Sequence, residues 1–230
     1  YSFLGVSVFI NAEIIKPFLA GRDVKRYQLP QSDKYLIITI RGINIENYPS
    51  VKNHLNQFKK KLQARAGKQA WYELQASPDD ISKFESPKIM YPDIALRSQA
   101  IYDRKGFFSV NTVYNIGVDD KYLLAIINSN LFHYYFSSIT NSIQGGYLRF
   151  FSQYMETVPI PIVAEEKKTE IIKYVDSLLK LNAELPISKL QSNVEQLKQR
   201  IAHSEEKINE LVYELYGLTK EEIKIVNNES

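Results

Sequence analysis

A seven-residue repeat of apolar side chains near the end of the chain restricts what this sequence can fold into. Its first position recurs as Ile187, Val194, Ile201, Ile208 and Leu215, and its second as Leu190, Leu197, Ser204, Leu211 and Leu218. This spacing forms one stripe along an α-helix, as in a coiled coil. Roughly 30 helical residues extend about 45 Å. The stripe must therefore pack on residues 165–183, on another part of the protein or on a second chain.

The segment just before this repeat is also predicted to be helical. Residues 165–183 place apolar side chains on one side of an amphipathic helix. Pro186 interrupts the helix before the repeat begins, and Gly217 ends the second helix. We therefore expect residues 164–230 to form a helical spacer and residues 1–163 to form a separate α+β domain.

Within residues 1–163 the patterns alternate between strand and helix. Strands are predicted over residues 35–41, 88–95 and 107–116, and helices from Pro49 to about Arg65 and from Asp119 to about Ser138. Pro92 marks its strand as an edge strand or a bulge. Residues 2–15 fit a strand or a short helix equally well. The stretch 142–163 opens with two glycines and closes with Pro-Ile-Pro, which predicts a turn, a last strand and an extended exit into the helices.

The amino-acid composition excludes several kinds of functional site. The absence of cysteine excludes disulfides, thiolate metal sites and cysteine nucleophiles. His54, His133 and His203 lie far apart in the sequence, with no partner at metal-ligand spacing. No apolar run approaches the roughly 20 residues of a membrane span. The chain begins at Tyr1 rather than Met, so we expect a piece of a longer protein. The lack of cysteine fits a reducing cytoplasm, and we expect that of a bacterium or archaeon. We expect no membrane partner.

The net charge of +3 is distributed unevenly. Residues 1–70 carry 12 Lys and Arg against 4 Asp and Glu, whereas residues 71–164 carry 7 against 9 and residues 165–230 carry 10 against 13. A basic first third favours a polyanionic partner, bound through phosphate contacts and counterion release. The alternative is a solvated basic helix face, and the run Lys59-Lys60-Lys61 fits both interpretations.

Two short segments contain candidate functional residues. Arg22, Lys25 and Arg26 follow Gly21 in a loop where guanidinium groups suit phosphate or guanine, unless Asp23 pairs with them. Asp93 with Asp103-Arg104-Lys105 loosely matches the PD…(D/E)xK pattern of metal-dependent nucleases, in which carboxylates hold Mg²⁺. We favour a hairpin-like turn with exposed charges for the second segment, and keep the nuclease as an alternative.

Six motifs occur in a fixed order and together resemble one protein family. They are KPFLAGRDVKRY, YPSVKNHLNQFKKKLQAR, WYELQ, SPKIMYPDIA, YLLAIINSNLFHYYF and GGYLRFFSQYMETVPIP. This series resembles the TaqI-like C-terminal specificity domain of N6-adenine DNA methyltransferases and of fused type IIG restriction-modification enzymes. The ending NELVYELYGLTKEEIKIV is similar to that of such proteins and of type I specificity subunits. The resemblance covers roughly residues 15–225.

The resemblance implies an architecture and a function. The fold would be a mixed β-sheet target recognition domain with packed helices, followed by an antiparallel pair of long helices as a coiled-coil-like spacer. The domain would bind double-stranded DNA for an N-terminal methyltransferase domain of the same parent chain. S-adenosylmethionine would bind in that missing domain, so the present chain would hold no cofactor and no metal and would not be catalytic. Whether the parent also cleaves DNA stays open.

The same resemblance implies where DNA contacts are to be sought. We expect them from Arg22, Lys25, Arg26, Arg97, Arg104, Lys105, Gln144, Tyr147 and Arg149. The alternative hypothesis is a helical protein–protein assembly module without sequence-specific DNA readout, in which the apolar stripe supports coiled-coil self-association.

Overall fold

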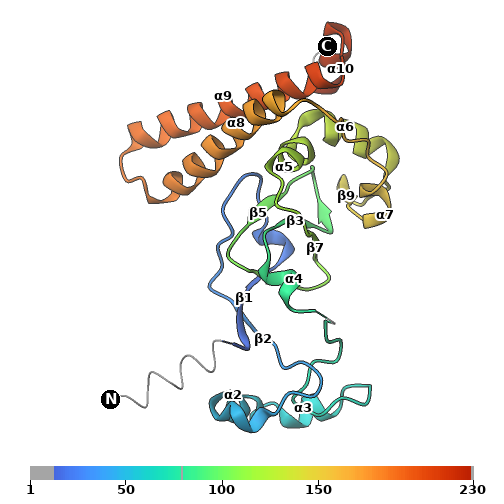
Figure 1. Ribbon diagram of the computed structural model, residues 1–230, viewed down its shortest axis with the longest axis vertical. Helices are drawn as coiled ribbons and strands as arrows, with labels where there is room; N and C mark the ends of the chain where they lie inside the picture. Colours follow the sequence, from blue (N-terminus) through green and yellow to red (C-terminus); the bar gives the residue numbers. More distant parts are fainter. Residues whose placement is uncertain (1–12, 79, 229–230) are drawn as a thin grey trace. The chain divides into compact units, whose positions relative to one another are not determined.

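The fold sorts the strand and helix segments into two units, seen in a computed structural model that describes residues 13–78 and 80–228 (Figure 1). The first unit comprises the chain up to Phe18, together with Ser32–Ser86 and Gly106–Phe108. The second comprises Leu19–Gln31, Pro87–Lys105 and the chain from Ser109 onward. The boundary predicted after residue 163 lies inside this second unit. Most of the segment 2–15 lies outside the described residues.

The first sheet is small and has the strand order β2-β1-β6. Strand β1 (Ile15–Leu19) pairs antiparallel with β2 (Tyr35–Ile37), with Ile15 opposite Ile37, and β6 (Phe108–Ser109) lies on the other side of β1. The strand predicted over residues 35–41 is therefore shorter than expected. The reason is that Thr39 bonds to the segment around Tyr72 instead of continuing the ladder: its hydroxyl donates to the Tyr72 carbonyl, and its own carbonyl accepts from the Leu74 N–H at 2.7 Å.

The predicted helix from Pro49 to Arg65 is two helices, α2 (Pro49–Asn56) and α3 (Lys59–Gln63), in the first unit. They follow the 3₁₀ turn η2 (Ile45–Asn47), and the short helix α4 (Ser82–Glu85) comes later. Beyond α3, Arg65 is turned inward and donates to the carbonyls of Leu62, Trp71 and Glu73. Arg65 is thus a structural residue rather than part of the basic surface.

The main sheet of the second unit has the order β5-β3-β7, with both pairs antiparallel. Strand β3 (Lys88–Pro92) is its central strand, between β5 (Ile101–Asp103) and β7 (Val113–Ile116). The expectation of an edge strand was wrong. Pro92 is the last residue of β3, so its missing N–H does not interrupt the hydrogen bonds of the residues before it. The prediction of exposed charge at Asp103 was also wrong: Lys88 and Asp103 face each other across the sheet as an ion pair, each side chain 0% exposed.

A second small sheet in this unit has the order β4-β9-β8. The chain switches sheets at Asp93, whose N–H donates to the Thr112 carbonyl and whose carbonyl accepts from the Phe150 N–H. Strand β4 (Ile94–Ala95) then pairs with β9 (Tyr147–Arg149), which pairs with β8 (Ser142–Ile143). The glycine pair forms the β8–β9 turn, with φ of +85° at Gly145 and +77° at Gly146, values that glycine adopts without strain.

Helices cover the rest of the second unit. The helix predicted from Asp119 is split into α5 (Lys121–Asn128) and α6 (Asn130–Ile139), because Ser129 takes an extended conformation and its hydroxyl caps α6. The short α7 (Ser152–Met155) follows β9, and α10 (Lys220–Asn227) ends the described chain. The cluster around Phe136, Phe150, Leu124 and Val175 forms the core of this unit.

The two long helices form an antiparallel hairpin, α8 (Glu165–Glu184) and α9 (Gln191–Leu215), joined through the 3₁₀ turn η3 (Leu185–Ile187) (Figure 1). Packing of the repeat on residues 165–183 is thus the arrangement that the fold adopts. Leu197, Ser204 and Ile208 of the repeat are buried, whereas Ile187 and Leu190 precede α9 and are exposed. The α+β fold class is confirmed, and coiled-coil self-association stays a prediction.

Candidate nucleic-acid interface

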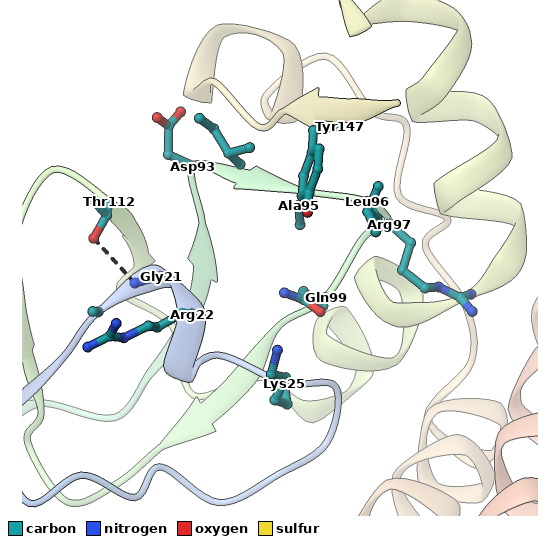
Figure 2. Close-up of a pocket in the computed structure, with 12 residues that line it drawn as sticks. Gly21, Arg22, Lys25, Asp93, Ala95, Leu96, Arg97, Gln99, Thr112 and Tyr147 are labelled. Carbon is teal, nitrogen blue, oxygen red and sulfur yellow. Dashed lines mark hydrogen bonds between the residues drawn. The ribbon is translucent and has the colours of Figure 1, made fainter. Parts of the chain in front are cut away.

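A cavity of about 640 Å³ lies in the second unit where the main sheet passes into the small sheet (Figure 2). Its walls come from four parts of the sequence: the turn around Gly21, the segment that follows β3, the β6–β7 loop and β9. The lining residues are Ala20, Gly21, Arg22, Lys25, Asp93, Ile94, Ala95, Leu96, Arg97, Gln99, Thr112 and Tyr147. Of the predicted contact residues, the fold brings together Arg22, Lys25, Arg97 and Tyr147 here.

The turn η1 (Gly21–Asp23) presents Arg22 to this cavity. Asp23 closes the turn, since its carboxylate accepts from the Ala20 N–H at 2.9 Å and its own N–H donates to the Ala20 carbonyl. Its ion pair with Arg22 is long, 3.9 Å, and the Arg22 side chain is 77% exposed. The Gly21 N–H donates to the Thr112 hydroxyl at 3.3 Å, which fastens the turn to the β6–β7 loop (Figure 2). Arg22 therefore lies in a turn whose backbone is fixed, and its guanidinium is exposed and only loosely paired with Asp23.

The carboxylate that lines this cavity is neutralised by an arginine. Arg149 Nη2 lies 3.2 Å from Asp93 Oδ2, and the guanidinium carbon is 4.3 Å from the centroid of the Phe151 ring. Both charged groups are largely buried. Arg149 therefore neutralises the charge of Asp93. The charge around the cavity is positive because of Arg22 and Lys25.

Arg97 and Arg26 face a different region of the second unit. Figure 2 shows the Arg97 side chain directed away from Gln99 and Arg22, and its Nη2 donates to the Asn130 side-chain oxygen at 2.8 Å. Arg26 lies 3.6 Å from Glu205 of α9. Both arginines line a second cavity of about 860 Å³ beside α9 and α10. Burial, and then repulsion from Arg26, lowers the pKa of Arg97. Because each guanidinium already has a protein partner, both arginines are less available to a ligand than the exposed Arg22.

The remaining predicted contact residues lie outside the first cavity. Arg104 pairs with Asp119 at 2.6 Å and lies over the Tyr102 ring. The Lys105 N–H donates to the Asp103 carboxylate while its side chain is exposed. Gln144 is exposed in the turn before the glycine pair. These three side chains are accessible at the surface, but the fold does not gather them with Arg22 and Lys25.

The lining residues that the predicted contacts did not include are Gln99, Thr112 and Leu96, together with Ala20, Gly21, Asp93, Ile94 and Ala95. None of the first three carries a charge or sits in a glycine-marked turn, and they were therefore overlooked. Leu96 had no sequence signal either: Ile94, Ala95 and Leu96 are all apolar, and their alternation of exposed, buried and exposed side chains appears only in the structure.

The lysine run on α3 belongs to the first unit. Lys59, Lys60 and Lys61 are all exposed, and none forms an ion pair with a carboxylate of the described chain. The Lys59 ammonium lies 5.1 Å from the centroid of the Trp71 ring. This segment offers cations without an enclosing cavity.

The nuclease alternative gains no support from this geometry. Asp103 is engaged with Lys88 and Asp93 with Arg149. Residues 13–78 and 80–228 contain no group of three or more histidine or carboxylate side chains placed to hold a metal ion. Within the same residues, no helix has the length and apolar character needed to cross a membrane.

The α+β fold with its basic cavity and its helical hairpin is that of a specificity domain. The chain belongs to the TaqI-like C-terminal specificity domain family, whose model matches residues 16–160. Its fold is similar to that of the type IIL restriction-modification enzyme MmeI, solved in complex with DNA, with a TM-score of 0.63 at 12% identity over 91% of this chain and 29% of the MmeI chain.

Two curated relatives are type II methyltransferases. M.BstVI of Geobacillus stearothermophilus is 22% identical over 96% of this chain, and M.XhoI of Xanthomonas vasicola is 22% identical over 80% of it. The chain spans 37% and 31% of the length of these relatives. The chain is thus a specificity domain of the kind found in restriction-modification enzymes.

Proposed function

We propose that this chain binds duplex DNA and reads a short base sequence for a methyltransferase domain of the same parent protein. The observation that supports this is the cavity of the second unit, which collects Arg22, Lys25 and Tyr147 from distant parts of the sequence and pairs its carboxylate with Arg149. Sequence readout needs cations for phosphates and fixed polar or aromatic groups for base edges, and this cavity has both.

The predicted contact residues then divide into two roles. Arg22, Lys25 and Tyr147 contact DNA directly, and the accessible Arg104, Lys105 and Gln144 contact flanking phosphates. Arg149, Arg97 and Arg26 position other groups, because each has a protein partner and is only partly exposed. Arg104 also has a partner, Asp119, but its side chain is 62% exposed. The lysines of α3 add contacts to the phosphate backbone that do not depend on sequence.

The catalytic steps belong to the rest of the parent protein. We place S-adenosylmethionine and the transfer of its methyl group to adenine N6 in a separate methyltransferase domain, consistent with relatives that are about three times as long as this chain. If that domain flips the adenine out of the helix, the present domain helps to hold the opened duplex.

The test is a fluorescence-anisotropy titration of the 230-residue chain with duplex DNA at several salt concentrations. We expect binding whose logarithm falls linearly with the logarithm of salt concentration. The double variant Arg22→Gln/Lys25→Gln should bind more weakly, and its slope should be smaller by about two.

A matched control changes the charge by the same amount elsewhere. Lys180→Gln/Lys198→Gln alters exposed lysines on the helical hairpin, and its binding should equal that of the unchanged chain. No binding at low salt would overturn the proposal, as would an equal loss in both double variants.

A further inference from the structure

The small sheet β4-β9-β8 presents an exposed apolar face beside the cavity. Leu96 is 57% exposed and Tyr147 is 41% exposed, while Ala95 and Leu148 on the opposite face are buried in the core. The register pairs Ala95 with Leu148, so the next step along the strands places Leu96 across from Tyr147 on the same face. Both side chains line the cavity (Figure 2).

An unused amide faces the same space. Figure 2 shows Gln99 between the Arg22 turn and the Leu96–Tyr147 face. In the part of the chain that the structure describes, its side chain has no hydrogen-bond partner, although it is only partly exposed. A glutamine side chain without a protein partner has its NH₂ donors and its carbonyl acceptor available to a ligand.

The combination of amide and apolar face matches one nucleic-acid feature. In the major groove an A·T pair presents adenine N6 and N7, which a glutamine binds with two hydrogen bonds, beside the 5-methyl group of thymine, which apolar side chains contact. A G·C pair has no such methyl group. The adjacent Arg22 and Lys25 carry the charge that suits the flanking phosphates.

We infer that this cavity reads an A·T base pair in the major groove of duplex DNA. Gln99 binds the adenine, and the face formed by Leu96 and Tyr147 contacts the thymine methyl group. This inference rests on the proposed function. The positive surroundings favour DNA over a protein occupant, because an apolar protein interface is depleted in unpaired charge at its centre.

The first experiment removes the methyl group from DNA. A preferred duplex is selected from a randomised library with the 230-residue chain, and each thymine is replaced in turn by deoxyuridine. One replacement should weaken binding about fourfold, the effect of one buried methyl group. Leu96→Ala should bind the thymine and deoxyuridine duplexes equally. Ile225→Ala is the matched control: Ile225 is an apolar residue of α10 that is 56% exposed, close to the 57% of Leu96, and does not line the cavity, so this variant should keep the discrimination.

The second experiment removes an acceptor from the adenine paired with that thymine. Substituting 7-deazaadenine should weaken binding of the unchanged chain roughly two- to tenfold, because one of the two hydrogen bonds to the adenine is lost. Gln99→Ala should lose the preference for adenine at this position and should be insensitive to the 7-deaza substitution.

The outcomes separate this inference from the proposed function. Duplex binding with a selected site that contains no methyl-sensitive thymine would overturn the inference and leave the proposed function intact. Failure to bind any duplex would overturn both. If Leu96→Ala instead weakened attachment of the parent's methyltransferase domain without affecting discrimination, the face would be a protein interface and the inference would be wrong.

Discussion

The two units of this chain carry positive charge in different ways. In the first unit, Lys59, Lys60 and Lys61 project from one short helix, and none pairs with a carboxylate of the described chain. In the second unit, Arg149, Arg26 and Lys88 are held against acidic partners. At the cavity, Arg22 is only loosely paired with Asp23, and Lys25 forms no ion pair within residues 13–78 and 80–228.

This difference separates affinity from specificity. Exposed flexible lysines attract any polyanion, because their interaction with phosphate depends on charge and salt but not on base sequence. Groups fixed by a turn and two sheets can distinguish one base edge from another, since hydrogen bonds to bases require position. We therefore expect changes in the first unit to alter how tightly DNA is bound, and changes in the second to alter which DNA is bound.

The largest expected effect concerns the buried charge of the second unit. Lys88→Met removes the ammonium that pairs with the fully buried Asp103, so the free energy of unfolding should fall by about 3–5 kcal/mol in urea titration. The double variant Lys88→Met/Asp103→Leu should recover most of this loss, because neither charge remains. A loss below about 1 kcal/mol in the single variant would mean that Asp103 finds another partner and that the pair is not essential to this sheet.

The second-largest expected effect is a loss of DNA binding when Lys59, Lys60 and Lys61 are all replaced by glutamine. Affinity should fall roughly ten- to hundredfold for every sequence, and the slope against salt should decrease by about three. The sequence selected from a randomised library should stay the same. A changed preference would show that this helix reads bases and would remove the contrast between the two units.

A smaller change tests how tightly the Arg22 turn is held. In Gly21→Ala the new Cβ would lie 2.7 Å from the Thr112 carbonyl oxygen, so the turn must shift, at a cost of about 1–3 kcal/mol. Sequence preference should weaken while salt-dependent binding to any duplex is retained. Gly117→Ala is the matched control, since no atom lies within 4 Å of its Cβ, and library selection with both variants measures the difference.

The smallest expected effect depends on pH. Burial, followed by the charges of Arg97 and Arg26, lowers the pKa of His133 from its usual 6.5. Below about pH 6.5 the unfolded chain takes up a proton at this position that the folded chain resists. Stability should therefore fall as the pH drops below that value, by at most about 1.4 kcal/mol per pH unit from this group.

Urea unfolding between pH 5 and 7.5 measures this contribution. His133→Gln should have a shallower loss of stability over this range than the unchanged chain. Identical pH profiles would show that the packing of Arg26 and Arg97 near His133 places no constraint on its protonation.

Much of the fold followed from local patterns. The 3.6-residue periodicity of residues 165–183 and the seven-residue repeat predicted α8 and α9, and the paired glycines predicted the turn before β9. The boundaries were less certain. Ser129 ends α5 and caps α6 through the Phe132 N–H, a local signal that the continuous apolar stripe concealed. Thr39 bonds to the Tyr72 carbonyl, a partner too distant in the sequence to be visible in a local window.

The candidate site, like the fold, could be predicted only in part from the sequence. The sequence by itself determined that the chain is α+β, that it ends in a long apolar-striped helix and that arginine, lysine and tyrosine are available near glycine turns. These properties depend on residues close together in the chain. Only the tertiary structure decided that Arg22 and Tyr147 share a cavity, that Arg26 turns to Glu205, that Asp103 is buried against Lys88 and that Gln99 is available. The physical reason is that pairing and burial depend on contacts between side chains far apart in sequence.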